Sequence, residues 1–361
     1  MSNLKTGTTS PLGLYIHWPY CIHKCPYCDF ASTVCKSPDE ELLLKTYKRD
    51  MDIFSDQRPL TSIFFGGGTP SLMSLQFCEK LMESIRQHYA FSKDIEISLE
   101  VNPDTVNKTK LKGFKELGVN RLSIGVQSLN KKDLQFLGRT HSVEDALCCI
   151  NNAKQIFNNV NIDLIYARPH QSLKAWEQEL LKALKLDLPH YSLYQLTIEE
   201  NTVFERKKQQ PCSQTQACRL YKLTDEIMQH HHRPAYEVSN YAKKGFECRH
   251  NMTYWLGQDY IGIGPAAHGR LGLKATENSR LVSLWTKTLP KQEMLTPKER
   301  ELEKMLMGLR LRQHPFPTSH LNPQKVQQAR QKGWIHMEKE GILPTQKGTL
   351  MLNQLVLLLS D

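Results

Sequence analysis

Residues 15–30 read YIHWPYCIHKCPYCDF, and they place Cys21, Cys25 and Cys28 within eight positions in the spacing C-x3-C-x2-C. The loop directly follows an apolar, β-favouring run at residues 12–18. Thiolates are soft ligands, and a tight loop can aim three of them at one inorganic centre. Iron–sulfur clusters usually take four cysteines, so a cluster held here would keep one iron without a protein ligand. Such an open position is what a metal site needs in order to bind a reactant.

Two other interpretations of the loop fit less well. A disulfide with a spare thiol is disfavoured because residues 1–10 carry no secretory signal. A structural zinc site would need a fourth ligand such as His17 or His23, and zinc ligands usually come as two separated pairs. The spacing therefore favours an iron–sulfur cluster.

The cysteine motif, with Tyr27 before its last cysteine and a strand before the loop, resembles the signature of the radical S-adenosylmethionine (SAM) superfamily. The wider phrase, Tyr-x-His-x-Pro-aromatic-Cys followed by Cys-Pro-Tyr-Cys-Asp-Phe, is similar to one branch of that superfamily. The branch contains the oxygen-independent coproporphyrinogen dehydrogenases and their haem-chaperone relatives, the HemW type. The resemblance covers about residues 12–355. It implies a [4Fe-4S] cluster on the three cysteines, with SAM chelated to the open iron.

Composition indicates a soluble globular chain, with 40% hydrophobic and 23% charged residues. No apolar run approaches the roughly 20 residues that a membrane span needs, and 361 residues allow one large domain plus a small one. Ten cysteines in this length do not make a disulfide scaffold, so we expect a reducing cytoplasm. Peripheral contact with the inner membrane face stays open.

The net charge of +10 would suit an RNA or an acidic lipid. The basic residues are spread along the chain, however, and short runs such as Lys207-Lys208 are typical of solvated faces. A porphyrin's propionates are anionic too, so charge does not choose the partner.

Apolar strand-like runs alternate with helical stretches through the first two thirds of the chain. We expect strands at residues 12–18, 62–65, 95–101, 121–126, 160–166 and 190–196. This alternation predicts an α/β fold with a parallel sheet of βαβ units, either doubly wound or an incomplete barrel. The resemblance implies the second, a partial (β/α)6 radical SAM barrel.

Distinctive polar residues follow the predicted strands, where parallel α/β folds place their sites. Three glycines, Gly66 to Gly68, would let backbone approach a ligand and leave N–H groups free to donate. The alternative is an ordinary tight strand-to-helix turn. Asp163 lies inside an apolar run, so we expect it to have a partner.

The resemblance implies a set of SAM contacts at these strand ends. They are Tyr15, Tyr27, Gly67, Gly68, Thr69, Glu100, Gln127, Arg139 and Asp163. Glu100 could bond a ribose or an amine, or favour a helix N-terminus. Arg139 could clamp a carboxylate, or be a solvated cation at a helix end.

One segment departs from the family pattern. Where the family has Gly-Leu-Pro-Gly after the fifth strand, this chain has Ala167-Arg168-Pro169-His170. The missing glycine puts the local loop geometry in question, though not the fold.

The phrase His-Asn-x-x-Tyr-Trp begins at His250 and places two aromatic residues, Tyr254 and Trp255, beside it. The histidine could bind haem iron with the ring packed on an aromatic neighbour, or could donate a hydrogen bond within a folded corner. By resemblance, this phrase marks the haem-chaperone branch, in which its histidine is implicated in haem binding. His268, in the following Ile261–Gly269 segment, is a second candidate axial ligand.

From Thr296 onward the pattern changes. Two helices (296–311 and 322–331), a hairpin about Glu340-Gly341 and a final helix (346–359) predict a small winged-helix-like α+β domain. We expect three parts. They are a radical SAM core barrel with the cluster loop at 8–240, a haem-binding or connector segment at 241–295, and the C-terminal domain at 296–361.

Two functions compete. The first is a haem chaperone that binds haem and a SAM-ligated cluster and delivers haem to membrane haemoproteins, with no catalytic residue of its own. The second is a coproporphyrinogen III dehydrogenase that decarboxylates propionates oxidatively by radical chemistry. By resemblance, dehydrogenases carry a further cysteine at the position of Phe30 and an N-terminal arm, whereas only about a dozen residues precede the first strand here. Both differences favour the chaperone.

The partners that we expect are haem and an acceptor haemoprotein at the membrane, and a homodimer stays open. No appended module with stacking aromatics for RNA is present in the sequence, so no nucleic-acid partner is expected.

Overall fold

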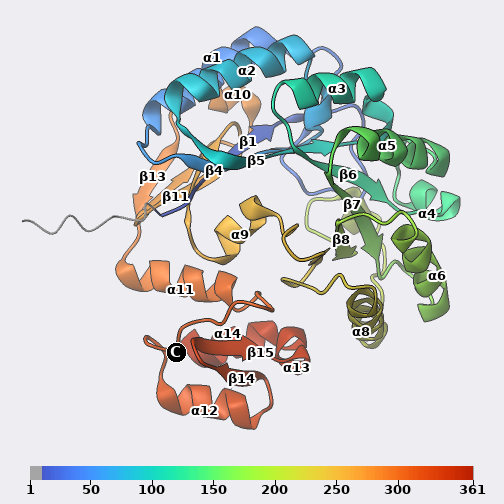
Figure 1. Cartoon of the computed structure of the whole chain (residues 1–361), viewed down its shortest axis with the longest axis vertical. Helices are drawn as coiled ribbons and strands as arrows, with labels where there is room; N and C mark the ends of the chain where they lie inside the picture. Colours follow the sequence, from blue (N-terminus) through green and yellow to red (C-terminus); the bar gives the residue numbers. More distant parts are fainter. Residues whose placement is uncertain (1–9, 361) are drawn as a thin grey trace, which may run out of the picture.

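The computed structural model describes residues 10–360, and its main sheet has the strand order β13-β12-β11-β10-β1-β4-β5-β6-β7-β8-β9 (Figure 1). The predicted polar N-terminal stretch up to residue 9, and residue 361, lie outside the described part. Six strands match the predicted parallel set: β1 (Leu12–Trp18), β4 (Leu60–Gly67), β5 (Phe91–Val101), β6 (Arg121–Gln127), β7 (Asn159–Tyr166) and β8 (His190–Gln195). They pair in parallel in the order of the chain. This order lacks the reversal of a doubly wound sheet, which confirms the partial (β/α)6 barrel.

Helices follow the strands and cover the outer face of the sheet (Figure 1). They are α1 (Glu40–Ile53), α2 (Leu75–His88), α3 (Lys108–Glu116), α4 (Lys131–Phe136), α5 (Val143–Ile156), α6 (Leu173–Leu184), the short α7 (Val203–Arg206) and α8 (Gln214–His230), with 3-10 turns η1 (Pro70–Leu72) and η2 (Pro103–Thr105). Each α-helix of this set begins after an Asp, Asn, Ser or Thr whose side chain accepts a backbone N–H of the first turn. These caps give each helix a defined first residue.

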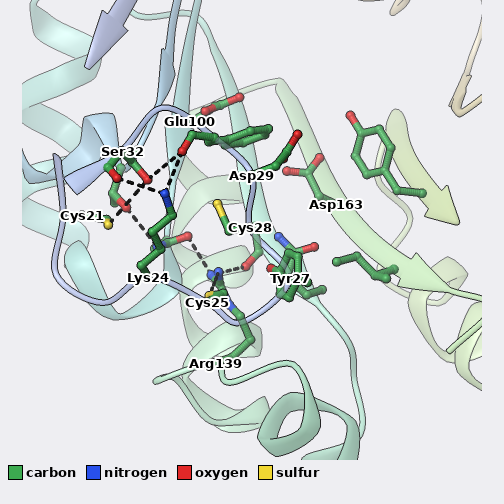
Figure 2. Close-up of a pocket in the computed structure, with 18 of the residues that line it drawn as sticks. Cys21, Lys24, Cys25, Tyr27, Cys28, Asp29, Ser32, Glu100, Arg139 and Asp163 are labelled. Carbon is green, nitrogen blue, oxygen red and sulfur yellow. Dashed lines mark hydrogen bonds between the residues drawn. The ribbon is translucent and has the colours of Figure 1, made fainter. Parts of the chain in front are cut away.

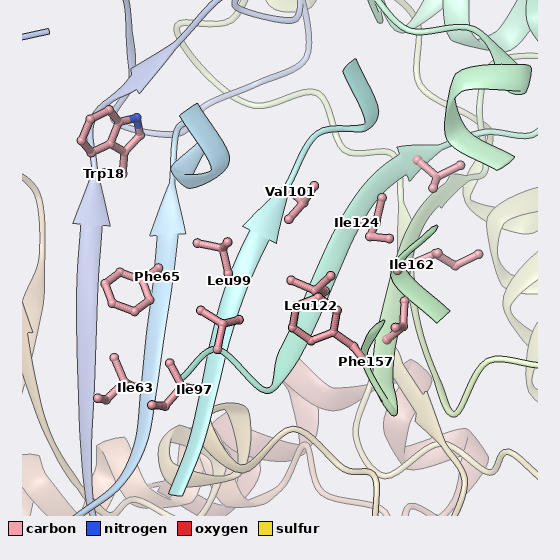
Figure 3. Packing of buried hydrophobic residues seen from close by; sticks show 14 of the residues in the cluster. Trp18, Ile63, Phe65, Ile97, Leu99, Val101, Leu122, Ile124, Phe157 and Ile162 are labelled. Carbon is pink, nitrogen blue, oxygen red and sulfur yellow. The ribbon is translucent and has the colours of Figure 1, made fainter. Parts of the chain in front are cut away.

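The strands are apolar toward the helices and polar toward the barrel interior. On β5, Ile97 and Leu99 pack in the core, as Figure 3 shows with their neighbours on adjacent strands. The alternating positions carry Glu96, Ser98 and Glu100. Because successive side chains of a strand point to opposite faces, one sheet builds both a dry core and a polar interior.

Strands that we did not predict extend the sheet beyond β1. β10 (Asp259–Ile263) pairs in parallel with β1, and β11 (His268–Leu271), β12 (Lys274–Glu277) and β13 (Lys291–Met294) follow as antiparallel neighbours. β9 (Asn240–Ala242) is added to β8 at the other edge. Part of the segment expected at 241–295 is therefore regular structure, since residues 271–290 contain β12 and the short helix α10 (Val282–Trp285). These strands have only three to five residues each, and β11 to β13 carry few apolar side chains, so they lack the longer apolar runs that predicted the other strands.

Asp50 of α1 ties this extension to the barrel. Its buried carboxylate accepts the Trp285 indole N–H at 2.8 Å, the Asn278 amide at 3.1 Å and the Gly264 N–H at 3.2 Å. Arg49 pairs with its other oxygen at 2.8 Å. A buried charge is tolerated when it is paired and hydrogen-bonded in this way.

The C-terminal domain has a core of its own. It contains α11 (Pro297–Gly308), α12 (Pro323–Gln331), the hairpin β14 (Ile335–Glu338) and β15 (Gly341–Pro344), α13 (Gln346–Leu350) and α14 (Leu352–Ser360). The helix–helix–hairpin–helix prediction is confirmed, with the last helix interrupted at Met351. Ion pairs such as Arg312–Asp225 at 2.9 Å and Arg270–Glu303 at 2.7 Å join this domain to the barrel. The proposed boundaries near 240 and 295 stay predictions.

None of the helices within residues 10–360 has the length and apolar character that crossing a bilayer requires.

The segment that departs from the family pattern keeps a glycine-like backbone without glycine. Ala167 has φ 55° and His170 has φ 61°, both in the left-handed region. The intervening Arg168 is buried and pairs with Glu179 at 2.5 Å and with Asp133 at 3.0 Å. The added cation is therefore a structural anchor for the loop, and it holds the two neighbouring residues in a conformation that costs free energy.

We predict that His170→Gly raises the urea midpoint, because it removes left-handed strain at an exposed position where no packing is lost. The gain is about 0.5 kcal/mol after the extra freedom of glycine in the unfolded chain is subtracted. Urea unfolding measures it. Lys174→Gly, at an exposed position within α6, is the matched control and should lose about 1 kcal/mol. If the urea midpoint of His170→Gly fell as far as that of Lys174→Gly, backbone strain at His170 would be contradicted.

Candidate functional site

The cysteine loop leaves β1 and is closed by its own hydrogen bonds. Two short strands, β2 (Tyr20–Cys21) and β3 (Thr33–Val34), pair in parallel at its base. Lys24 donates from Nζ to the carbonyl oxygens of Phe30 at 3.0 Å and Ser32 at 3.1 Å. All three cysteines are free thiols, and Figure 2 shows them on this one loop with Arg139 beneath and Asp163 across the cavity.

A cavity of about 520 Å³ opens at the carboxyl ends of the strands, and the loop forms one of its walls. Ten further predicted or neighbouring groups share it: Tyr27, Gly67, Gly68, Thr69, Glu100, Asn102, Ser123, Gln127, Arg139 and Asp163. This size lies within the roughly 300–1,000 Å³ typical of small-molecule sites. The convergence expected from the strand-end rule is thus present in the structure.

The cysteines fit a multi-iron cluster better than a single ion. In residues 10–360 no three His, Cys, Asp or Glu side chains lie close enough together to hold one metal ion, which disfavours zinc. Cysteines of an iron–sulfur cluster can each bind a different iron, so their sulfurs need not meet at one point. Burial raises the pKa of the Cys21 and Cys28 thiols, so a bound metal would have to displace their protons.

Arg139 joins the loop to the strand tips. Its Nη1 lies 3.4 Å from the Cys25 sulfur, and its Nη2 donates to Asn102 Oδ1 at 2.7 Å and to the Gly125 carbonyl at 2.9 Å. These bonds rule out the alternative that Arg139 is a freely solvated cation at a helix end. Its Nε–H is buried and has no acceptor among the described residues. Because Arg139 also lines the cavity, its guanidinium fits a carboxylate ligand there.

The glycine segment has a different role from the one we predicted. Its N–H groups are already used, since Gly67 donates to Glu100 Oε2 at 3.1 Å, Gly68 to the Trp18 carbonyl at 2.7 Å and Thr69 to the Tyr20 carbonyl at 2.8 Å. A Cβ on Gly68 would lie 2.4 Å from the Tyr20 oxygen. The expectation of free donors was therefore wrong: the glycines are required because the start of the cysteine loop packs directly on them.

Two buried acids face the cavity. Burial, together with the neighbouring Asp163 charge, raises the pKa of Glu100 to about 8. Burial also raises the pKa of Asp163, which accepts from Asn161 Nδ2 at 2.7 Å and Ser123 Oγ at 3.2 Å. The partner expected for Asp163 is thus confirmed.

Asn102 is a site residue that we did not include among the SAM contacts. Its amide donates to Thr69 Oγ1 at 3.2 Å while its oxygen accepts from Arg139. It therefore bridges the tips of β4 and β5 to the arginine. The signal was its place directly after a strand and before Pro103. Gln127, at the end of β6, lines the same cavity with φ 67°.

Tyr15 and His250 do not join the cysteine cavity. Tyr15 points into the barrel interior, where its hydroxyl lies 3.0 Å from His17 Nδ1, and it lines two neighbouring cavities. His250 lies on α9 (Arg249–Trp255), with Nδ1 3.0 Å from Ser62 Oγ and Nε2 2.7 Å from the Tyr254 hydroxyl. Burial lowers the pKa of His250 to about 3. His250 therefore makes the hydrogen bonds of the second alternative, a histidine within a folded corner. His268, the other candidate axial ligand, is exposed and lines a different cavity.

Comparison with known proteins first identifies the superfamily and the fold of this chain. The family model for the radical SAM superfamily matches residues 15–183. The fold also matches the solved coproporphyrinogen III oxidase (HemN) of Escherichia coli, with a TM-score of 0.82 and 21% identity over 97% of this chain and 90% of that one.

Sequence similarity then narrows the family. The chain is 34% identical to "Heme chaperone HemW" of Buchnera aphidicola from Schizaphis graminum, over 97% of this chain and 99% of that protein. It is 35% identical to the protein of that name in Bacillus subtilis, over 94% and 97%. The chain therefore belongs to the HemW family of the radical SAM superfamily.

We predict that Gly68→Ala displaces the cysteine loop, because the added Cβ meets backbone atoms of Tyr20 that cannot rotate away. The expected result is a loss of about 2 kcal/mol or more in stability, together with a fall in iron and sulfide bound after anaerobic reconstitution. Gly272→Ala is the control: nothing lies within 4 Å of its added Cβ, so it should lose only the backbone strain of φ 60°, about 1 kcal/mol, and keep its iron content. Normal iron content in Gly68→Ala would show that the contact is not required.

A second prediction concerns pH. Between the ordinary pKa of 4.5 and the raised value of about 8, Glu100 keeps its proton in the folded chain and loses it in the unfolded chain. Its contribution to stability therefore falls as pH rises through this window and levels off above it. Urea unfolding of cluster-free Glu100→Gln should show an advantage over the wild type that grows across the window. The control Glu116→Gln, at an exposed position, should show the same pH dependence of the unfolding free energy as the wild type. If Glu100→Gln also followed the wild type across the window, the raised pKa of Glu100 would be refuted.

Proposed function

We propose that this protein is a haem chaperone that binds haem and a SAM-ligated [4Fe-4S] cluster, and that it delivers haem to an acceptor haemoprotein at the membrane. The observation that carries the proposal is the almost end-to-end similarity to proteins named as haem chaperones. Phe30, at the position where dehydrogenases have a further cysteine, supports it.

Cys21, Cys25 and Cys28 would hold the cluster, and its open iron would supply a position for the amine and carboxylate of SAM. Arg139, which lines this cavity, would orient the carboxylate through its guanidinium. Asn102 fixes the arginine, and Glu100 faces the same space as an acceptor or, when protonated, as a donor. In this proposal Gly67, Gly68 and Thr69 position the loop, and Tyr27, Gln127 and Asp163 complete the cavity wall.

The acceptor would meet an apolar part of the surface. Within residues 281–294, the side chains of Leu281, Leu284, Leu289 and Met294 are 61%, 48%, 70% and 68% exposed. Large exposed apolar side chains close together in the chain are typical of a partner surface. The proposed compartment is the cytoplasm, with contact at the inner membrane face only while haem is handed over.

The test uses anaerobically reconstituted full-length protein. We expect it to bind haem, to leave coproporphyrinogen III unchanged, and to transfer haem to an apo-haemoprotein. Absorbance spectra follow the haem, and chromatography of the porphyrins follows turnover. The triple variant Cys21→Ser, Cys25→Ser, Cys28→Ser is the matched control that separates haem binding from any role of the cluster in transfer. Conversion of coproporphyrinogen to protoporphyrinogen would instead establish the dehydrogenase.

A further inference from the structure

A second cavity of about 520 Å³ lies beside the cysteine cavity. The two cavities share a wall made by Asp29, Phe30, Gly67 and Glu100. The remaining walls come from distant parts of the chain, including the turn before β11 and helix α11 of the C-terminal domain. Of the residues predicted to contact SAM, Tyr15, Gly67 and Glu100 also line this second cavity.

The second cavity offers one unengaged imidazole. His268 is 55% exposed, and no hydrogen bond to its ring occurs among residues 10–360; the nearest charged atom is Glu277 Oε1 at 4.0 Å. By contrast, His17 in the same cavity contacts the Tyr15 hydroxyl and the Ala31 carbonyl through its two ring nitrogens. His250 is likewise engaged at both nitrogens. A metal ligand needs a free nitrogen lone pair, and of these three only His268 supplies one.

The other lining groups suit a large, flat, anionic ring. Tyr254 and Tyr260 form an edge-to-face pair with ring centroids 4.6 Å apart, and both line the cavity. Arg280 is exposed at the rim, where its Nη2 lies 3.3 Å from the Asp29 carbonyl. Aromatic walls can pack on a porphyrin face, and a guanidinium can bind a propionate in bidentate geometry. Met307 of α11 closes the cavity from the C-terminal domain.

We infer that this second cavity is the haem subsite, that His268 and not His250 binds the haem iron, and that Arg280 binds a propionate. The inference rests on the proposed haem-binding function and locates the haem in the second cavity. Haem held here would lie across Phe30 and Glu100 from the cysteine cavity, with an aromatic side chain of the cysteine loop between the two sites.

Haem titration of the full-length protein tests the ligand. His268→Ala should weaken haem binding roughly tenfold or more and shift the Soret band, while His268→Cys should bind haem with the different Soret position of a thiolate ligand. A purely structural role would not produce this ligand-dependent band. His336→Ala, at an exposed histidine of β14 that lines neither cavity, is the matched control and should behave as the wild type.

The outcomes separate the two proposals. Failure of the wild type to bind haem would overturn the proposed function. Haem binding that is unchanged in affinity and spectrum by His268→Ala and His268→Cys would overturn the inference alone. If His250→Phe lost the Soret spectrum of bound haem and His268→Ala kept it, His250 of α9 would be the iron ligand instead.

A second comparison tests Arg280. Arg280→Ala should weaken the binding of haem roughly tenfold, but it should leave the binding of haem dimethyl ester nearly unchanged, because the ester has no propionate charge. Lys274→Ala, a nearby cation that does not line the cavity, serves as the control. Equal losses for haem and its ester in Arg280→Ala would exclude the propionate contact.

Discussion

The contact between two backbone segments, Trp18 to Tyr20 and Gly67 to Thr69, fixes the position of everything at the top of the barrel. Two backbone hydrogen bonds of 2.7 and 2.8 Å and the absence of a Cβ on Gly68 bring the start of the cysteine loop onto the tip of β4. Arg139 then holds the other side of the loop through Cys25. A flexible three-cysteine loop thus becomes a defined wall, which is what binding a preformed ligand set requires.

The polar interior of the barrel links the cavities to one another. Glu100 lines the cysteine cavity, the second cavity and a smaller one beside His250. Its pKa is raised to about 8 because it is buried near Asp163, so its charge changes close to neutral pH. A ligand in any one of these spaces therefore meets a carboxyl group that the other two also contact. Glu100 reaches all three cavities because the side chains of β5 alternate between the two faces of the sheet and Glu100 lies on the interior face.

The sequence was sufficient for the parallel core because long apolar runs, capping residues and strand-end polar groups are local signals. It also placed Glu100, Gln127, Arg139 and Asp163 at the correct edge. It could not show that the glycine N–H groups are consumed by Trp18 and Tyr20, since that contact joins segments nearly fifty residues apart. β10 to β13 were missed because they are only four or five residues long and β11 to β13 carry few apolar side chains. The burial of His250 depends on Ser62 and Tyr254, and its motif alone does not distinguish a ligand from a hydrogen-bonded histidine.

The two domains have separate cores, and the contacts between them include exposed or half-buried ion pairs such as Arg312–Asp225 and Arg270–Glu303. Interfaces of this polar kind separate more readily than apolar ones. Met307 of α11 lines the second cavity from the C-terminal domain, so a separation of the two domains would widen that cavity while both cores stay intact. If haem binds in the second cavity as proposed, such a separation would let it leave while the barrel stays folded.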